Sequence, residues 1–134
     1  MQAIVPYLTV KGAGDAVAFY QKAFGATENA RHVAEDGKRF MHIALTIHGG
    51  DVFLCDEFPE YGGAPAPTAE KPAPVSITIQ LEKPADVDAV FRQAVQAGGT
   101  SVSEPADMFW NARFAQLRDP FGHIWMLNAQ LPEK

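Results

Sequence analysis

Apolar residues follow the same pattern twice along this chain: an alternating run, a stripe with helical spacing, and further alternating runs. Residues 3–10 and 75–81 each open such a unit as an expected strand. A helix is expected from Asp15 to Gly25 and another from Pro84 to Gly98, because apolar residues recur every three to four positions between a start signal and a glycine stop. Strands are expected at residues 27–34, 39–48 and 51–55 in the first unit, and three strands follow Gly99 in the second.

The two units also match in their residues. DAVAFYQKAFGAT, from Asp15, parallels DAVFRQAVQAGGT, from Asp88, and GDVFLC parallels GHIWML in the last strands. We interpret this as a fused duplication of one βαβββ unit. Chance likeness between two ordinary β/α segments is the alternative.

A proline-rich stretch separates the two units. Residues 57–74 contain five prolines and two glycines, a composition that disfavours regular structure. The sequence therefore predicts a single domain over residues 1–134, with module 1 at about 1–57, a linker at 58–74 and module 2 at about 75–130.

Composition narrows the classes of function. The chain has 134 residues, of which 47% are hydrophobic, enough for a real core. Its net charge of -5 disfavours nucleic-acid and membrane-surface partners, so we expect neither. The single cysteine excludes an internal disulfide framework, and no signal peptide or apolar run of roughly 18 residues is evident. We therefore expect a cytoplasmic protein.

Paired βαβββ units with the opening YLTV…FYQKAFGA and the ending RDPFGHIW resemble the vicinal oxygen chelate superfamily, which includes glyoxalase I, bleomycin-resistance proteins, fosfomycin-resistance enzymes and extradiol dioxygenases. Two longer motifs look like those of a bacterial branch of this superfamily that is often labelled demethylubiquinone methyltransferase-like. They are HGGDVFLCDEFPEYGG and PADMFWNARFAQLRDPFGHIW. No glycine-rich strand-to-helix loop for S-adenosylmethionine is evident, so we do not expect a methyltransferase. The resemblance implies an α+β fold: two tandem βαβββ modules forming facing curved sheets around a cavity, with helices outside.

Metal-dependent members of the superfamily take ligands from the first and last strand of each module. The resemblance places those positions at Val5, Leu54, Ser76 and Met126, with Leu54 matched to Met126 by the repeat. None is a credible ligand for a divalent metal, so we expect no metal and no cofactor.

The same register predicts which side chains line the cup. Val52, Leu54 and Asp56 are expected to face it, with Phe53 and Cys55 packed under the helix. The further expected cup residues are Val5, Tyr7, Thr9, His42, Ala44, Thr46, Ser76, Thr78, Gln80, Phe114, Gln116, Arg118, Ile124, Met126 and Asn128. An aromatic and cationic rim of Trp110, Arg113 and Phe114 is expected to contact the ligand.

Several chemical candidates keep a second interpretation. His42 is the best candidate for a catalytic base or ligand. Cys55 is a nucleophile or, as expected, a buried apolar residue, and His48 and His123 are expected to be solvated or to stabilise turns. Asp56 and Glu57 could hold a relocated metal with His42, or be solvated loop acids. Asp119 is expected to stabilise its own turn.

These observations lead to one expected function and two alternatives. The expected function is metal-independent binding of a small amphipathic molecule in the cup, by a protein that forms a homodimer as its relatives commonly do. The first alternative is a lyase or dioxygenase-type enzyme that uses a relocated metal or His42 as acid or base. The second is a structural dimerisation module.

Overall fold

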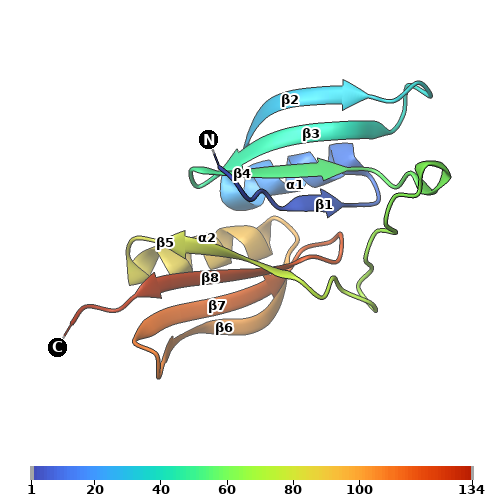
Figure 1. The fold of residues 1–134 in the computed structure, drawn as a ribbon. Coiled ribbons are helices and arrows are strands. Elements are labelled where there is room, and N and C mark those ends of the chain that lie inside the picture. Colours follow the sequence, from blue (N-terminus) through green and yellow to red (C-terminus); the bar gives the residue numbers. More distant parts are fainter. Residues whose placement is uncertain (1, 134) are drawn as a thin grey trace.

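The computed structural model describes residues 2–133 and contains the two expected βαβββ modules, each with one four-stranded sheet and one helix (Figure 1). Module 1 contains β1 (Tyr7–Thr9), α1 (Ala13–Phe24), β2 (Thr27–Val33), β3 (Phe40–Ile47) and β4 (Gly50–Cys55). Module 2 contains β5 (Ser76–Leu81), α2 (Pro84–Gln96), β6 (Thr100–Met108), β7 (Ala112–Arg118) and β8 (Ile124–Gln130). The one regular element of the linker is a 3₁₀ turn, η1 (Pro59–Tyr61).

Both sheets have the same topology, as a duplication predicts. The strand orders are β1-β4-β3-β2 and β5-β8-β7-β6; the first pair of each sheet is parallel and the other pairs are antiparallel. In Figure 1 the sheets lie one below the other, with α1 and α2 behind them on the same side. Neither helix within residues 2–133 is long and apolar enough to cross a membrane.

The core lies between the helices and the sheets and runs through both modules. Tyr20 and Phe24 of α1 pack against Trp125 of β8, with ring centroids 5.3 and 4.7 Å from the indole. Trp125 and Tyr20 are fully buried. Because the largest aromatic side chains of the core come from different modules, the two modules share one hydrophobic core.

The start of α1 is capped by Asp56, the residue that follows β4, and not by a side chain of its own first turn such as Asp15. Gly12 N–H and Ala13 N–H donate to Asp56 Oδ1 at 3.0 and 2.8 Å, and Phe40 N–H donates to Oδ2 at 2.8 Å. Asp56 is therefore buried under the helix, where its charge meets the positive end of the helix dipole. Its expected position in the cup is wrong.

The register of β4 is also shifted by one residue from the prediction. Val52 and Leu54 are buried against the helix, whereas Phe53 and Cys55 point to the opposite side. The cause is turn length: Ile47 and Gly50 are joined by two residues, but the equivalent pair, Asp119 and His123, is joined by three. Aligning GDVFLC on GHIWML without this insertion turned every β4 side chain to the wrong face.

Candidate functional site

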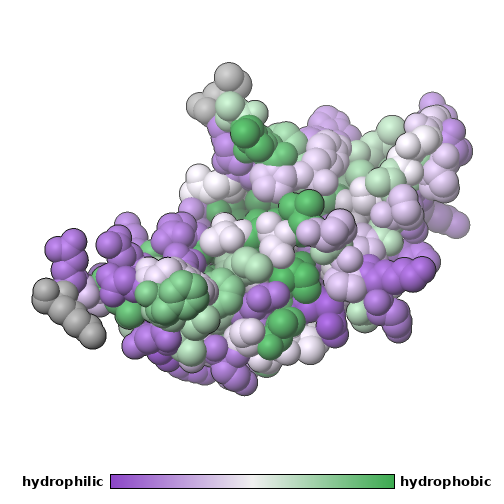
Figure 2. Space-filling model, turned by 60° about the horizontal axis from the view of Figure 1, so that its bottom comes forward, coloured by the Kyte–Doolittle hydropathy of each residue, from purple (hydrophilic) through white to green (hydrophobic). Residues whose placement is uncertain are grey.

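The side of both sheets that the helices do not cover carries most of the predicted cup residues. We call it the open face, and its side chains alternate with buried ones along β3, β4, β5, β7 and β8. It comprises Tyr7, Thr9, His42, Ala44, Thr46, Phe53 and Cys55 in module 1, and Ser76, Thr78, Gln80, Phe114, Gln116, Arg118, Ile124, Met126 and Asn128 in module 2. All of them are half-buried or exposed. Hydrophobic and polar residues are interspersed on the molecular surface in Figure 2.

An aromatic cluster of Tyr7, His42 and Phe53 occupies the open face of module 1. The ring centroid of Phe53 lies 4.8 Å from that of His42 and 5.8 Å from that of Tyr7, in edge-on geometry. Tyr7 pairs in register with Phe53 across the parallel β1–β4 pair, which places both rings on one side of the sheet. Tyr7 remains 51% exposed, so this cluster is accessible to a ligand.

The hydrogen bond between Tyr7 and His42 is compatible with either tautomer of the imidazole. Tyr7 Oη lies 2.8 Å from His42 Nδ1 and 3.2 Å from the carbonyl oxygen of Met41. If the hydroxyl donates to the carbonyl, neutral His42 carries its proton on Nδ1 and its Nε2 is an acceptor. If the hydroxyl donates to Nδ1, Nε2 carries the proton and is a donor. His42 Nε2, the nitrogen that Tyr7 does not use, can therefore act as acid or base.

The neighbouring thiol is not activated as a nucleophile. Burial raises the pKa of Cys55, and the nearby Asp56 carboxylate adds to this, against a lowering by its hydrogen bond with Thr9. Burial likewise raises the pKa of the Tyr7 hydroxyl, with a smaller contribution from Cys55. Both groups are therefore protonated at neutral pH, and neither offers an anionic nucleophile there.

A second cluster spans the open face of module 2. Trp110 Nε1–H donates to Asn128 Oδ1 at 3.4 Å, and Asn128 Nδ2–H donates to Gln80 Oε1 at 3.1 Å. The Trp110 ring meets Phe114 edge-on, with centroids 5.6 Å apart. This arrangement joins an accessible indole to a row of amides that begins at β8 and ends at β5.

Two predicted contact residues lie elsewhere. Leu54 is fully buried in the core, because β4 has the shifted register. Arg113 lies on the helix side of β7, where it pairs with Asp88 of α2 and with Asp107, each at 3.0 Å. Its guanidinium fastens α2 to the sheet, so the rim consists of Trp110 and Phe114 without it.

Two further predictions concern the DPFG turn. Asp119 has the structural role expected of it: its carboxylate is buried and accepts hydrogen bonds from the backbone of Phe121 and His123 and from the side chains of Tyr20 and Trp125. His123 is buried, not solvated, and its Nε2–H donates to the carbonyl oxygen of Thr9 at 2.9 Å. This bond ties the turn of module 2 to β1 of module 1.

The donors on the first and last strands of each module do not fit a divalent metal. Within residues 2–133, no three His, Cys, Asp or Glu side chains lie close enough together to hold an ion. In the observed register β4 presents Phe53 to the open face and β8 presents Met126, while β1 and β5 present Tyr7 and Thr78. A phenyl ring, a thioether and neutral hydroxyls do not supply the imidazole or carboxylate ligands that zinc or manganese prefers.

Phe53 is the open-face residue that the sequence reasoning missed. It belongs to the apolar run VFLC, in which every residue is a credible core residue, so alternation gives no phase. The available signal was the extra residue in the DPFGH turn relative to HGGD. When this extra residue is included in the alignment of the two units, Phe53, and not Leu54, is the equivalent of Met126.

Comparisons with known proteins agree with this architecture. Residues 3–127 match the family model of the Glyoxalase/Bleomycin resistance protein/Dioxygenase superfamily. An uncharacterised protein of Mycobacterium bovis is 40% identical over 131 residues, covering 98% of this chain and 85% of that protein. The crystal structure of protein PA1353 from Pseudomonas aeruginosa superposes with a TM-score of 0.77 at 25% identity, covering 98% of this chain and all of that one.

A third similar structure is the putative 3-demethylubiquinone-9 3-methyltransferase, PhnB protein, of Bacillus cereus. It has a TM-score of 0.70 and 21% identity, with 96% of this chain and 97% of that one covered. At this identity the likeness shows the common fold alone.

Proposed function

Because this chain belongs to the Glyoxalase/Bleomycin resistance protein/Dioxygenase superfamily, we propose that it uses the superfamily's sheet surface to bind a small amphipathic molecule without a metal ion. The observation that carries the proposal is the Tyr7–His42–Phe53 cluster on the open face. No helix of module 1 covers this cluster, and two of its rings carry hydrogen-bonding groups, the Tyr7 hydroxyl and the His42 imidazole.

The chemistry of the open face defines the ligand. Aromatic edges and faces at Phe53 and Phe114 favour a flat apolar body. His42, Gln80 and Asn128 offer donors and acceptors for its polar groups. Binding sites for small molecules commonly combine an apolar surface with a few placed polar groups.

The donor chemistry supports metal independence. On the strands that carry the ligands in metal-dependent relatives, this chain presents Tyr7, Phe53, Thr78 and Met126. Hydrogen bonding and aromatic stacking are then the means by which it would recognise a ligand. We expect the purified protein to hold no stoichiometric divalent ion, and we expect its melting temperature to be the same with zinc, manganese or a chelator. One equivalent of tightly bound metal in elemental analysis would contradict this part of the proposal.

Binding itself is tested with an aromatic amphipathic probe, 8-anilino-1-naphthalenesulfonate, by fluorescence titration of the native protein. We expect saturable binding that weakens about three- to tenfold in Phe53→Ala, since one aromatic contact contributes roughly 0.5–1.5 kcal/mol. His42→Ala removes a ring from the same cluster and weakens binding in the same direction.

Val95→Ala is the matched control, because Val95 is an exposed apolar residue on α2, away from the open face. It leaves the affinity unchanged. Non-saturable binding, or equal losses in Phe53→Ala and Val95→Ala, would refute the site.

A second candidate function is catalysis of the lyase or dioxygenase type, and the hydrogen bond between Tyr7 and His42 is the observation that favours it. His42 Nε2 would take or give a proton while Tyr7 fixes the ring. Isomerisation of hemithioacetals and ring cleavage of catechols are the reactions to assay. Turnover that His42→Gln abolishes would favour this candidate over binding alone; equal rates in both proteins would exclude His42 as its acid or base.

We also propose a homodimer, as the resemblance implies. Large apolar side chains outside the two open-face clusters stay exposed on one copy, among them Ile4, Val33 and Phe109, and a second copy would cover part of them. Sedimentation equilibrium should give twice 14.5 kDa. A monomer mass at micromolar concentration would contradict the dimer.

A further inference from the structure

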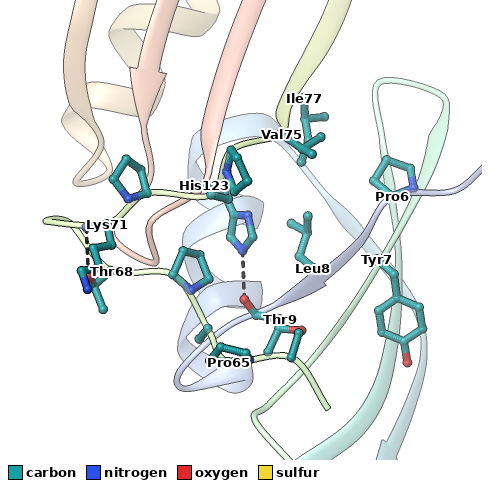
Figure 3. Close-up of a pocket in the computed structure, with 16 residues that line it drawn as sticks. Pro6, Tyr7, Leu8, Thr9, Pro65, Thr68, Lys71, Val75, Ile77 and His123 are labelled. Carbon is teal, nitrogen blue, oxygen red and sulfur yellow. Dashed lines mark hydrogen bonds between the residues drawn. The ribbon is translucent and has the colours of Figure 1, made fainter. Parts of the chain in front are cut away.

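The proline-rich linker forms one wall of an open cavity beside β1 that the open-face site does not use. The cavity has a volume of about 670 Å³ and lies between residues 64–75 of the linker, β1 and the start of β5 (Figure 3). Its size is within the range of about 300–1,000 Å³ typical of small-molecule sites. Tyr7 borders both this cavity and the open face, so it cannot be used to tell the two apart.

The wall of the cavity is mainly aliphatic. Its lining residues are Pro6, Tyr7, Leu8, Thr9, Ala64, Pro65, Ala66, Pro67, Thr68, Lys71, Pro72, Ala73, Pro74, Val75, Ile77 and His123. Prolines of the linker, among them Pro65, line the cavity together with Leu8 of β1 and Ile77 of β5 (Figure 3). Such a wall favours a flexible hydrocarbon chain, which gains burial at every methylene.

The charge of the lining has a single sign. None of these lining residues carries a carboxylate, although the chain as a whole has a net charge of -5, and Lys71 supplies the one ammonium group. The imidazole of His123 is engaged through Nε2 with the carbonyl oxygen of Thr9. The Thr68 hydroxyl oxygen accepts a hydrogen bond from the backbone N–H of Lys71 at 3.1 Å, so the hydroxyl proton is available to another acceptor. Lys71 and Thr68 together suit a carboxylate.

The linker is fixed at several points, so the cavity exists before a ligand arrives. Near its beginning, Ala66 N–H donates to Glu57 Oε2 at 2.8 Å. Near its end, Ala73 N–H donates to the carbonyl oxygen of Gly122 at 2.8 Å. Between them, Pro67 packs so closely on Gly122 that an added Cβ there would lie 2.8 Å from the Pro67 carbonyl carbon. A preformed site avoids the entropy cost of ordering the linker on binding.

We propose that this cavity is a second ligand site and that it takes a single-chain aliphatic carboxylate. The hydrocarbon chain lies between the linker prolines and Leu8 and Ile77, and the carboxylate meets the Lys71 ammonium and the Thr68 hydroxyl. The proposal stands apart from the open-face site, since none of its polar contacts involves His42 or Phe53.

Calorimetric titration with decanoate, octanoate and 1-decanol tests the proposal on the full chain. We expect one decanoate per chain, bound about fifteenfold tighter than octanoate, because each added methylene contributes about fourfold. Lys71→Met weakens decanoate binding about fivefold and leaves 1-decanol unchanged, since only the carboxylate loses its partner. Ala73→Phe fills the cavity and abolishes binding of both ligands, while its backbone bond to Gly122 can persist.

The controls separate this site from the open face. Lys22→Met removes an exposed ammonium on α1, outside the cavity lining, and Phe53→Ala alters the open face; both should bind decanoate as the native chain does. Val75→Trp is a second filling variant, which decides the matter if Ala73→Phe does not fold. Failure of decanoate to saturate at millimolar concentration, equal weakening of decanol and decanoate in Lys71→Met, or weakening by Phe53→Ala would each overturn the proposal. The anilinonaphthalene titration of the open face is unaffected by any of these results.

Discussion

Replacing Asp119 with alanine removes the acceptor on which the junction of the two modules depends. Its Oδ2 accepts from Tyr20 Oη at 2.5 Å and from Trp125 Nε1 at 2.9 Å, and its Oδ1 accepts from two backbone N–H groups of the turn. Tyr20 and Trp125 are fully buried. Leaving two buried donors without a partner costs about 1–3 kcal/mol each, so we expect Asp119→Ala to lose about 4 kcal/mol of the free energy of unfolding.

Asparagine is not expected to rescue the site. Each carboxylate oxygen of Asp119 accepts hydrogen bonds from two donors. In Asp119→Asn an NH₂ group replaces one of these oxygens, so its N–H groups point at two donors and cannot bond to them. Urea unfolding measures both variants in a Trp110→Phe background, where buried Trp125 is the only tryptophan left to report. Asp107→Asn, an exposed carboxylate on β6, is the control and should hardly move the midpoint. A loss below 1 kcal/mol in Asp119→Ala at an unchanged denaturant slope would refute the reasoning.

Three further predictions concern register, the linker contact and pH. Leu54→Ala should lose about 2–5 kcal/mol of unfolding free energy and Phe53→Ala clearly less, because Leu54 is fully buried and Phe53 is not; equal losses in urea unfolding would reject the β4 register. Gly122→Ala should destabilise more than Gly49→Ala: both glycines have positive φ, at 92° and 83°, but only Gly122 meets another backbone within 3 Å, and thermal melts that rank them equally would argue against close packing of the linker. Burial, followed by the charge and hydrogen bond of Asp119, raises the pKa of Tyr20 well above its usual value of about 10. As the pH rises, this tyrosine therefore ionises in the unfolded chain before it ionises in the folded chain. The free energy of unfolding should then decrease above pH 10 by up to about 1.4 kcal/mol per pH unit, and Tyr20→Phe should remove that decrease.

The duplicated architecture could be predicted because the hydrophobic periods of both units are clear. Helical spacing between Asp15 and Gly25 and alternation in VSITIQL correspond to α1 and β5. In β5, Ile77, Ile79 and Leu81 face the helices as predicted, because polar residues between them fix the phase of the strand.

The failures arise where the local sequence carries no such phase or where the partner lies far along the chain. All of VFLC is apolar, so the predicted phase of β4 rests on its alignment with β8, which the extra residue in the module 2 turn shifts by one position. Arg113 looked like a rim residue, but its partner Asp88 lies 25 residues earlier on α2. Asp56 caps a helix that begins 43 residues before it. Contacts of this kind follow from the tertiary fold and leave no periodic signal.

The most direct test of the account is a ¹⁵N–¹H NMR titration of the native chain with 8-anilino-1-naphthalenesulfonate. The proposed open-face site predicts saturable shifts, with one affinity, in the amides around His42, Ala44 and Phe53, and none along the solvent side of α1 and α2. Shifts confined to the helices or to the linker, or an absence of saturable shifts, would contradict the claim that this protein binds small amphipathic molecules on the open face of its paired sheets.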